Sequence, residues 1–369
     1  MTCKSSPGAW AAVLPPLLVL LISPTLADDG PLRPDSHAPA GVMVDHMHKA
    51  GEFMVGYRYS LMPQKGGMRF GKSEVADIHI PDSACGPGDH AACAMKPVEM
   101  TMQMHMLDIM YAPTDWLTLM VMPQWMSMDM TMSPLQRPMH GGHGGHDHHG
   151  EHDDHGHGGH MGTHSHGTDG IGDTQLAALF RISQGPGYSL HGTLGLSAPT
   201  GSIEERGRNG LVTHYMMQLG SGTWDLLPSL TYTGHVDRFA WGLQVGGIKR
   251  LEDENERGWR YGDVFQTTAW ASYRILDWVS ASVRLAHMQQ GIIEGHWNVP
   301  HNHSSPPDYQ PNYGGNFWDI GFGVNMVVPD GFLEGHRLAV EWIEPIRDEP
   351  NGYQLERDGT LYLNWSKAF

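Results

Sequence analysis

The sequence predicts an all-β fold, a transmembrane antiparallel β-barrel of about twelve strands with long extracellular loops. Three observations indicate it. Apolar and polar residues alternate in pieces of about 11 to 13 residues, as strands do. Short and long links between these pieces alternate strictly along the chain. The last piece keeps its apolar and polar alternation up to a terminal aromatic residue, Phe369. A soluble β-sandwich would share the alternation, but the ordered link lengths match the short periplasmic turns and long outer loops of outer-membrane barrels.

A secretory signal peptide is expected over residues 1–27. A lone Lys4 precedes an apolar run, and small residues lead to a cleavage point between Ala27 and Asp28, as in exported proteins. The run is shorter than the roughly 20 apolar residues of a membrane-spanning helix.

Residues 28–50 are expected to form a periplasmic N-terminal arm. Met43, His46, Met47 and His48 give this arm thioether and imidazole groups. They fit either an ordinary arm or a small set of metal ligands, and the sequence leaves both interpretations open.

The barrel is expected to occupy residues 51–369. Its strands are predicted at 51–62, 99–111, 116–130, 171–183, 188–198, 223–234, 238–250, 262–274, 278–290, 316–328, 335–345 and 357–369. Residues 131–170 are predicted to form a His-rich extracellular loop. Tyr111, Trp116 and Trp278 lie beside short turns, where barrels carry an aromatic girdle.

The charge of the chain narrows its partners. The formal net charge is −17, and −18 once Lys4 leaves with the signal peptide. This negative charge disfavours nucleic acid as a binding partner and favours cations. The chain contains no nucleophile motif such as G-x-S-x-G, and we therefore expect no enzyme.

Cleavage of the signal peptide removes Cys3 and leaves Cys85 and Cys93. A single cysteine pair in an exported chain predicts a disulfide. The alternative is a thiolate metal site, which an oxidising compartment disfavours.

A histidine-rich tract within the predicted loop 131–170 is the main candidate for metal binding. It holds eleven histidines and four carboxylates among many glycines. Imidazole binds borderline divalent ions, and glycine lets the backbone fold around an ion. The candidate ligands are His140, His143, His146, His148, His149, His152, His155, His157, His160, His164 and His166. The tract has no zinc-finger spacing, which predicts several weak, exchangeable sites. A solvated loop that binds nothing is the alternative.

Methionines recur at every second position of two neighbouring predicted strands, which places each series on one strand face. One series shares its face with Asp108, and a mid-strand charge belongs in the lumen because lipid-facing charges cost several kcal/mol. Glu99 and Gln103 on the opposite face argue against this, unless they form a rim above the membrane. Methionine as an adaptable apolar filler is the alternative. The candidate ligands are Met102, Met104, Met106, Met120, Met122, Met126, Met128 and Met130.

The two ligand types together favour copper. Thioether sulfur selects Cu(I), whereas imidazole also serves Cu(II), zinc and nickel. We therefore expect exchangeable copper first and zinc or nickel second, with no tightly bound cofactor. His296, His301 and His303 lie in another long loop, where solvated side chains are favoured over accessory metal binding.

Five segments carry a family resemblance: DHMHKAGEFMVGYRY (45–59), GIGDT (170–174), LGLSAPTGSI (194–203), QLGSGTWDLLPSLTY (218–232) and YGDVFQTTAWASYRILDW (261–278). Through them the chain resembles the family of outer-membrane transporters named for the meta-pathway of phenol degradation. The resemblance implies a barrel in the cell outer membrane. It implies no catalytic residue, and it says little about the solute because the family's substrates are diverse.

Two functions stay open on the sequence alone. The first is an outer-membrane channel or transporter-like protein that binds or handles transition-metal ions, with outer-membrane lipid, metal ions and periplasmic metal-handling proteins as partners. The second is a channel for small aromatic or hydrophobic solutes, in which the His-rich loop is an accessory.

Overall fold

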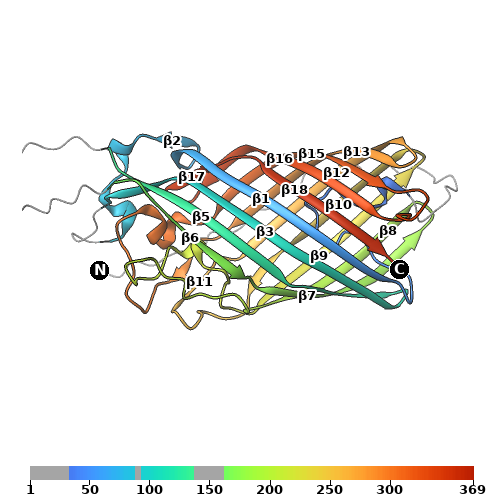
Figure 1. Cartoon of the computed structure of the whole chain (residues 1–369), viewed down its shortest axis with the longest axis horizontal. Helices are drawn as coiled ribbons and strands as arrows, with labels where there is room; N and C mark the ends of the chain where they lie inside the picture. The colour runs from blue at the N-terminus through green and yellow to red at the C-terminus, as the bar shows by residue number, and fades with distance from the viewer. Residues whose placement is uncertain (1–32, 88–92, 137–161) are drawn as a thin grey trace, which may run out of the picture.

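The computed structural model describes residues 33–87, 93–136 and 162–369. Within these residues, twelve long antiparallel strands close into a barrel. Closure is made by β1 (Phe53–Phe70), which pairs with β3 (Met95–Thr114) on one side and β18 (Thr360–Ala368) on the other (Figure 1). Every predicted strand overlaps an observed one, so the predicted fold class is confirmed.

The other strands follow in chain order around the barrel, and three of the twelve are interrupted. They are β4 (Leu117–Met122) with β5 (Gln124–Pro134), β6 (His164–Ile171) with β7 (Thr174–Gly185), β8 (Tyr188–Ala198), β9 (Asp225–Val236), β10 (Phe239–Arg250), β12 (Val264–Leu276), β13 (Val279–Gln290), β15 (Gly315–Val327), β16 (Arg337–Pro350), and β17 (Gln354–Arg357) with β18. Pro123 separates β4 from β5, since proline has no N–H to donate to the neighbouring strand.

The long-loop end carries the short elements that lie between the barrel strands. They are β2 (Ser73–Val75), β11 (Trp259–Arg260), β14 (Glu294–Gly295) and the 3₁₀ turns η2 (Asp77–His79), η3 (Asp82–Cys85), η4 (Tyr215–Met217), η5 (Pro306–Asp308) and η6 (Gln310–Asn312). An aromatic cluster ties these loops together, in which the rings of Tyr215 and Trp297 stack at 4.9 Å. In the described part of the chain, no helix has the length and apolar character needed to cross a membrane.

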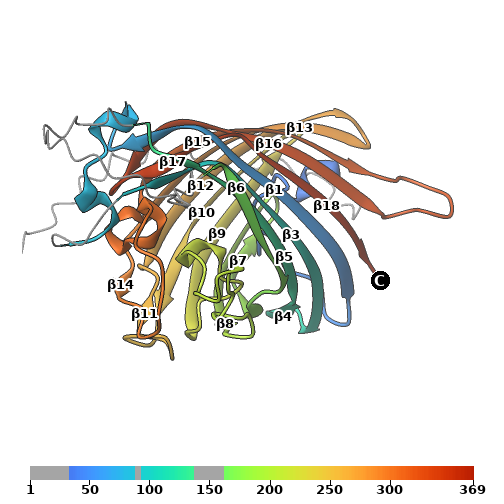
Figure 2. The ribbon, with the colours of Figure 1, turned by 60° about the vertical axis from the view of Figure 1, so that its left-hand side comes forward.

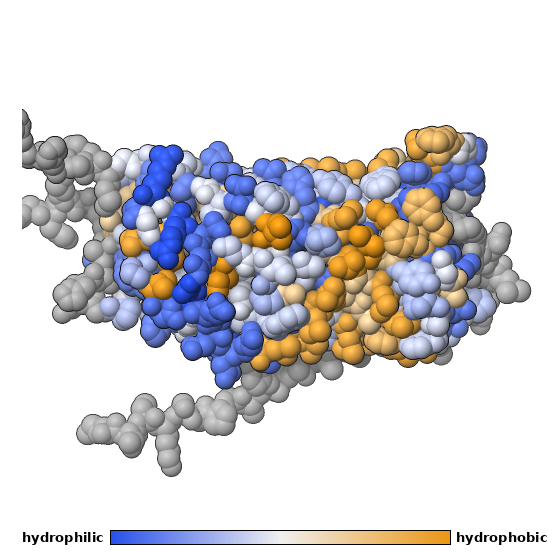
Figure 3. Space-filling view, turned by 60° about the horizontal axis from the view of Figure 1, so that its bottom comes forward, coloured by the Kyte–Doolittle hydropathy of each residue, from blue (hydrophilic) through white to orange (hydrophobic). Residues whose placement is uncertain are grey.

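The outer surface is divided along the barrel axis. Apolar side chains gather toward the short-turn end, and hydrophilic side chains dominate the long-loop end (Figure 3). On β3, Leu107 and Tyr111 are exposed near the short turns, whereas Glu99 is exposed near the loops. The apolar zone fits lipid contact. The polar outward residues of β3 therefore belong to a rim beyond it, and the methionines of the opposite parity face inward.

The structure corrects the limits of the predicted loop 131–170. β5 runs on to Pro134 and β6 begins at His164, with Met132 paired to His164. Pairing between β5 and β6 continues beyond the apolar zone. In this part β6 contains glycine, histidine and threonine and lacks the apolar alternation by which strands are predicted. His164 and His166 are consequently strand residues.

The described part of the N-terminal arm runs inside the barrel at residues 38–44, which corrects the predicted periplasmic position of this part of the arm. Lumenal side chains donate to its backbone: Arg58 to the carbonyls of Ala40 and Val42, at 3.1 and 3.0 Å, and Gln244 to that of Met43 at 2.8 Å. Its 3₁₀ turn η1 (Pro34–Ser36) and the following residues appear dark blue within the short-turn end (Figure 2). Backbone carbonyls of the arm accept these hydrogen bonds, and side-chain periodicity does not reveal such contacts.

Candidate functional site

A wall of methionine thioethers lines one side of the lumen on β1, β3, β4 and β5. Residues opposite each other on antiparallel strands share a face, with Cβ atoms about 4.5–5.5 Å apart. The register pairs Met100 with Met130, Met102 with Met128, Met104 with Met126, Met110 with Met120, Met62 with Met102, and Met54 with Met110. The lumenal orientation of the two methionine series is confirmed.

The wall packs as two groups. The outer methionine cluster comprises Met95, Met100, Met128, Met130, Met132 and Met217, with Leu219 and Leu355. The inner methionine cluster comprises Met54, Met106, Met110, Met120 and Met122, with Leu179. Met102 and Met126 pack against the outer cluster and Met104 against the inner one. The thioethers therefore continue from the loop end to the inner part of the barrel.

The methionines are well packed. Met122 and Met128 are 0% exposed, so side chains rather than open water fill this part of the lumen in the structure. Any solute that passes here must displace or slide between flexible methionine side chains.

Histidines meet the wall at its outer end. On β6, His166 pairs in register with Met130 and His164 with Met132. The ring of His166 lies 5.3 Å from that of His214, whose Nδ1 is 2.7 Å from Asp308 Oδ1. His214 and Asp308 were missed by the sequence analysis, because the fold joins loops that are 94 residues apart in the chain.

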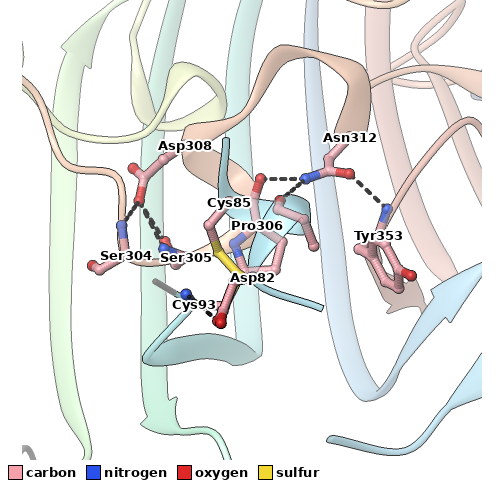
Figure 4. The surroundings of a disulfide bond; sticks show 10 residues. Asp82, Cys85, Cys93, Ser304, Ser305, Pro306, Asp308, Asn312 and Tyr353 are labelled. Carbon is pink, nitrogen blue, oxygen red and sulfur yellow. Dashed lines mark hydrogen bonds between the residues drawn. A yellow bond between two sulfur atoms is a disulfide. The ribbon is translucent and has the colours of Figure 1, made fainter. Parts of the chain in front are cut away.

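Asp308 is fixed as a carboxylate at this outer end. It accepts hydrogen bonds from the backbone N–H groups of Ser304 and Ser305 and from the Ser305 hydroxyl (Figure 4). Burial alone would raise the pKa of Asp308, but His214 and these donors lower it below its ordinary value. A buried anion beside imidazoles is a favourable place for a cation.

Cys85 and Cys93 form a disulfide beside this loop, with 5.4 Å between their Cα atoms. The Asn312 side chain donates to the Ala84 carbonyl at 2.6 Å, and Figure 4 shows the two segments side by side. The disulfide thus stiffens a loop that packs on the one holding Asp308.

A third group of ligand-type side chains lies on the arm. His37, Asp45 and His46 each offer an atom such that the three atoms lie within 4.8 Å of one another. Burial alone would raise the pKa of Asp45, yet His46, His37 and Arg58 lower it well below its usual range. Burial, together with His46 and Arg337, lowers the pKa of His37 well below its ordinary value. A carboxylate and a neutral imidazole are the forms of these side chains that bind metals.

Nine of the predicted histidine ligands lie outside the described residues. They are His140, His143, His146, His148, His149, His152, His155, His157 and His160. All eight methionines proposed as ligands are in the wall, and His164 and His166 adjoin it.

The chain is similar in structure to several solved outer-membrane barrels, and the first of them shares its fold. The COG4313 outer membrane channel from Pseudomonas putida F1 matches with a TM-score of 0.54 and 16% identity, over 89% of this chain and 99% of that one. A Pseudomonas aeruginosa FadL homologue matches with a TM-score of 0.38 and 9% identity, over 86% of this chain and 90% of that one. The β domain of the Bordetella autotransporter BrkA matches with a TM-score of 0.42 and 12% identity, over 86% and 100%. No protein-family model and no curated protein matches the chain.

The closed barrel, its outward apolar zone and the first of these likenesses define the class of the protein. It is an outer-membrane β-barrel with a channel-like fold, and its apolar zone lies in contact with membrane lipid.

Proposed function

We propose that this barrel handles transition-metal ions, copper first and zinc or nickel second. The histidines of the tract at 140–166 collect ions at the outer end, and the methionine wall carries them through the lumen. Ions bind exchangeably, and a periplasmic metal-handling protein is the partner on the inner side.

The continuity of the thioether wall is the observation that supports this proposal most. Paired methionines extend from His166 on β6 to Met54 near the inner end of β1. Thioether sulfur is a soft, neutral ligand for Cu(I). A series of similar weak sites suits conduction, which needs binding that is favourable enough to enter and weak enough to leave.

A channel for small hydrophobic solutes is the competing function. The burial of the methionine clusters suits it as well, because methionine is apolar and deformable. The two functions differ in what sulfur contributes: a metal needs the lone pairs of the thioether, whereas an apolar solute needs only the volume of the side chain.

Metal analysis of the purified protein in detergent tests the proposal. We would compare the intact chain with a variant carrying Met102→Leu, Met104→Leu, Met126→Leu and Met128→Leu, and with one in which the nine outer-tract histidines are glutamine. Leucine keeps the apolar volume at a cost below about 1.5 kcal/mol per site. Met326→Leu is the matched control, because Met326 has the opposite parity to the lumenal Asn325.

The proposal predicts that the leucine variant binds less Cu(I), or its redox-inert analogue Ag(I), while the glutamine variant binds fewer equivalents of Cu(II) and Zn(II) than the intact chain. The control should bind as the intact chain does. Equal metal content in all four proteins would contradict the proposal and favour the hydrophobic-solute function.

A further inference from the structure

The arm folds back on itself inside the barrel, and this fold brings its histidines together. The backbone N–H of Ala38 donates to Asp45 Oδ2 at 2.8 Å, and that of Val42 donates to the Pro39 carbonyl at 3.0 Å. Val44 adopts a φ of 49°, an unfavourable conformation for a β-branched residue. Such strain persists only where the surroundings enforce it.

The two histidines of the arm next to Asp45 are oriented through one ring nitrogen each. His46 Nδ1 lies 2.9 Å from Asp45 Oδ1, and His48 Nδ1 lies 3.3 Å from Glu52 Oε2. Metal-ligating histidines are commonly held by a carboxylate on the nitrogen that does not bind the metal, and Glu52 holds His48 in this way.

The other ring nitrogen of each histidine is buried and unsatisfied. Nε2 of His46 and Nε2 of His48 have no hydrogen-bond partner among the described residues, and His48 is only 5% exposed. Buried polar atoms are nearly always bonded to something. Two such nitrogens on rings whose centroids are 5.0 Å apart point to a shared ligand.

The spacing of the group suits a metal ion. The His37 and His46 ring centroids are 3.9 Å apart, and one atom from each of His37, Asp45 and His46 lies within 4.8 Å of the others. Tetrahedral bonds of about 2.0–2.1 Å place ligand atoms about 3.4 Å apart, so shifts of less than about 1 Å per side chain would close the site.

The charges around the group partly oppose and partly favour a cation. The positive charge of the Arg337 guanidinium near His37 disfavours a bound cation, whereas the negative charge of the Asp45 carboxylate favours one. A second buried carboxylate, Asp35, is already paired with Arg33 at 2.7 Å. The donor set is imidazole nitrogen plus one carboxylate, which suits borderline divalent ions better than Cu(I).

We propose that His37, Asp45 and His46, with Nε2 of His48 as the fourth donor, bind one divalent transition-metal ion such as Zn(II) or Cu(II) inside the barrel. The binding itself does not depend on the proposed transport. A role for this site as the inner end of the methionine path does rest on that proposed function. The two are adjacent, since Met43 and Met47 of the same arm pack against the inner methionine cluster.

The site is reachable from the short-turn end. A cavity of about 690 Å³ is lined by His37, His46 and His48 of the arm and by His235 and Trp270 of the barrel. The short-turn end is periplasmic in barrels of this kind. An ion at this site would therefore exchange with the periplasm.

Zinc titration of the full-length protein in detergent tests the site. The nine outer-tract histidines are first replaced by glutamine to remove their background. We would measure Zn(II) affinity by competition with a chromophoric chelator and ligand geometry by Co(II) absorption. The test variants are His37→Gln, the mildest change, and the combination of His37→Gln, Asp45→Asn and His46→Gln; His235→Gln, in the same cavity, is the control.

The proposal predicts one tight Zn(II) equivalent and a tetrahedral Co(II) spectrum in the parent and in the His235→Gln control. His37→Gln should weaken binding at least tenfold, and the combined variant should abolish both signals. Unchanged affinity in His37→Gln or in a combined variant that still migrates as a folded barrel would overturn it. If the arm site binds Zn(II) as predicted but the leucine variant binds Cu(I) like the intact chain, only the proposed transport is overturned. If the leucine variant loses Cu(I) but the arm site binds no Zn(II), only the proposed site is overturned.

Discussion

At the scale of single residues, buried charge pairs hold the arm in place. Arg58 pairs with Asp108 at 3.1 Å while donating to two arm carbonyls. Arg284 forms two hydrogen bonds with Glu341, which is 0% exposed and accepts from the backbone N–H of Gly41. In each pair one member also binds the arm, Arg58 through its guanidinium and Glu341 through its carboxylate, so the arm and the lumen stabilise one another.

Replacing Arg58 by glutamine should therefore destabilise the barrel. The Asp108 carboxylate, 3% exposed, would be left without its partner, and breaking a buried pair in this way costs about 3 kcal/mol. The urea midpoint of the folded barrel should fall accordingly. Arg238→Gln, at an exposed turn, should leave the midpoint unchanged; an equal shift in both variants would contradict the assignment.

Among the elements of the barrel, the described part of the arm fills the inner lumen without joining the sheet. It is held by side-chain hydrogen bonds from several strands rather than by a strand of its own. Deleting residues 33–48 should raise single-channel conductance in planar bilayers several-fold, because the backbone that fills the inner lumen is gone. Deleting 140–160 should have little effect. Conductance that is unaffected by loss of the arm would show that the plug lies elsewhere.

The disulfide belongs to the same scale. It closes a loop with a sequence separation of 8, for which the chain-entropy model gives about 2–3 kcal/mol of local stabilisation. Replacing Cys85 and Cys93 by serine should speed hydrogen exchange in residues 71–87 and, through the Asn312–Ala84 contact, in 305–312. The strands β9 to β13 serve as the internal control. If hydrogen exchange becomes faster only in residues 71–87, the two loops are not coupled.

The strands could be predicted from sequence because alternation and link length are local signals. Their outer ends could not, since β6 carries residues such as Gly167 and Thr168 that pair only because β5 extends beside them. The arm escaped prediction for a related reason: its lumenal position depends on backbone carbonyls and on distant donors such as Asn325. The methionine face could be predicted, because Asp108 has the same parity. The contact of His214 with Asp308 could not, because only the folded loops bring them together.

At the scale of the whole molecule, the ligand-type residues are arranged along one axis. Histidines His164 and His166 stand at the outer end, the methionine wall continues inward, and the His37–Asp45–His46 group lies beside the inner cavity. The donors change from imidazole to thioether and back to imidazole. A packed lumen of this kind predicts slow, selective passage rather than the bulk flow of an open porin.

Transport of Cu(I) along the methionine wall can be measured as the rate of Cu(I) entry into proteoliposomes loaded with a copper-sensitive dye. The measurement compares the intact barrel, the Met102→Leu, Met104→Leu, Met126→Leu and Met128→Leu variant, and the Met326→Leu control, with uptake of a small uncharged aromatic solute recorded in parallel. If the methionine wall carries Cu(I), the four leucines should slow Cu(I) entry at least tenfold, while Cu(I) entry through the control and uptake of the aromatic solute stay unchanged. Cu(I) entry at the same rate in all three proteins would contradict it.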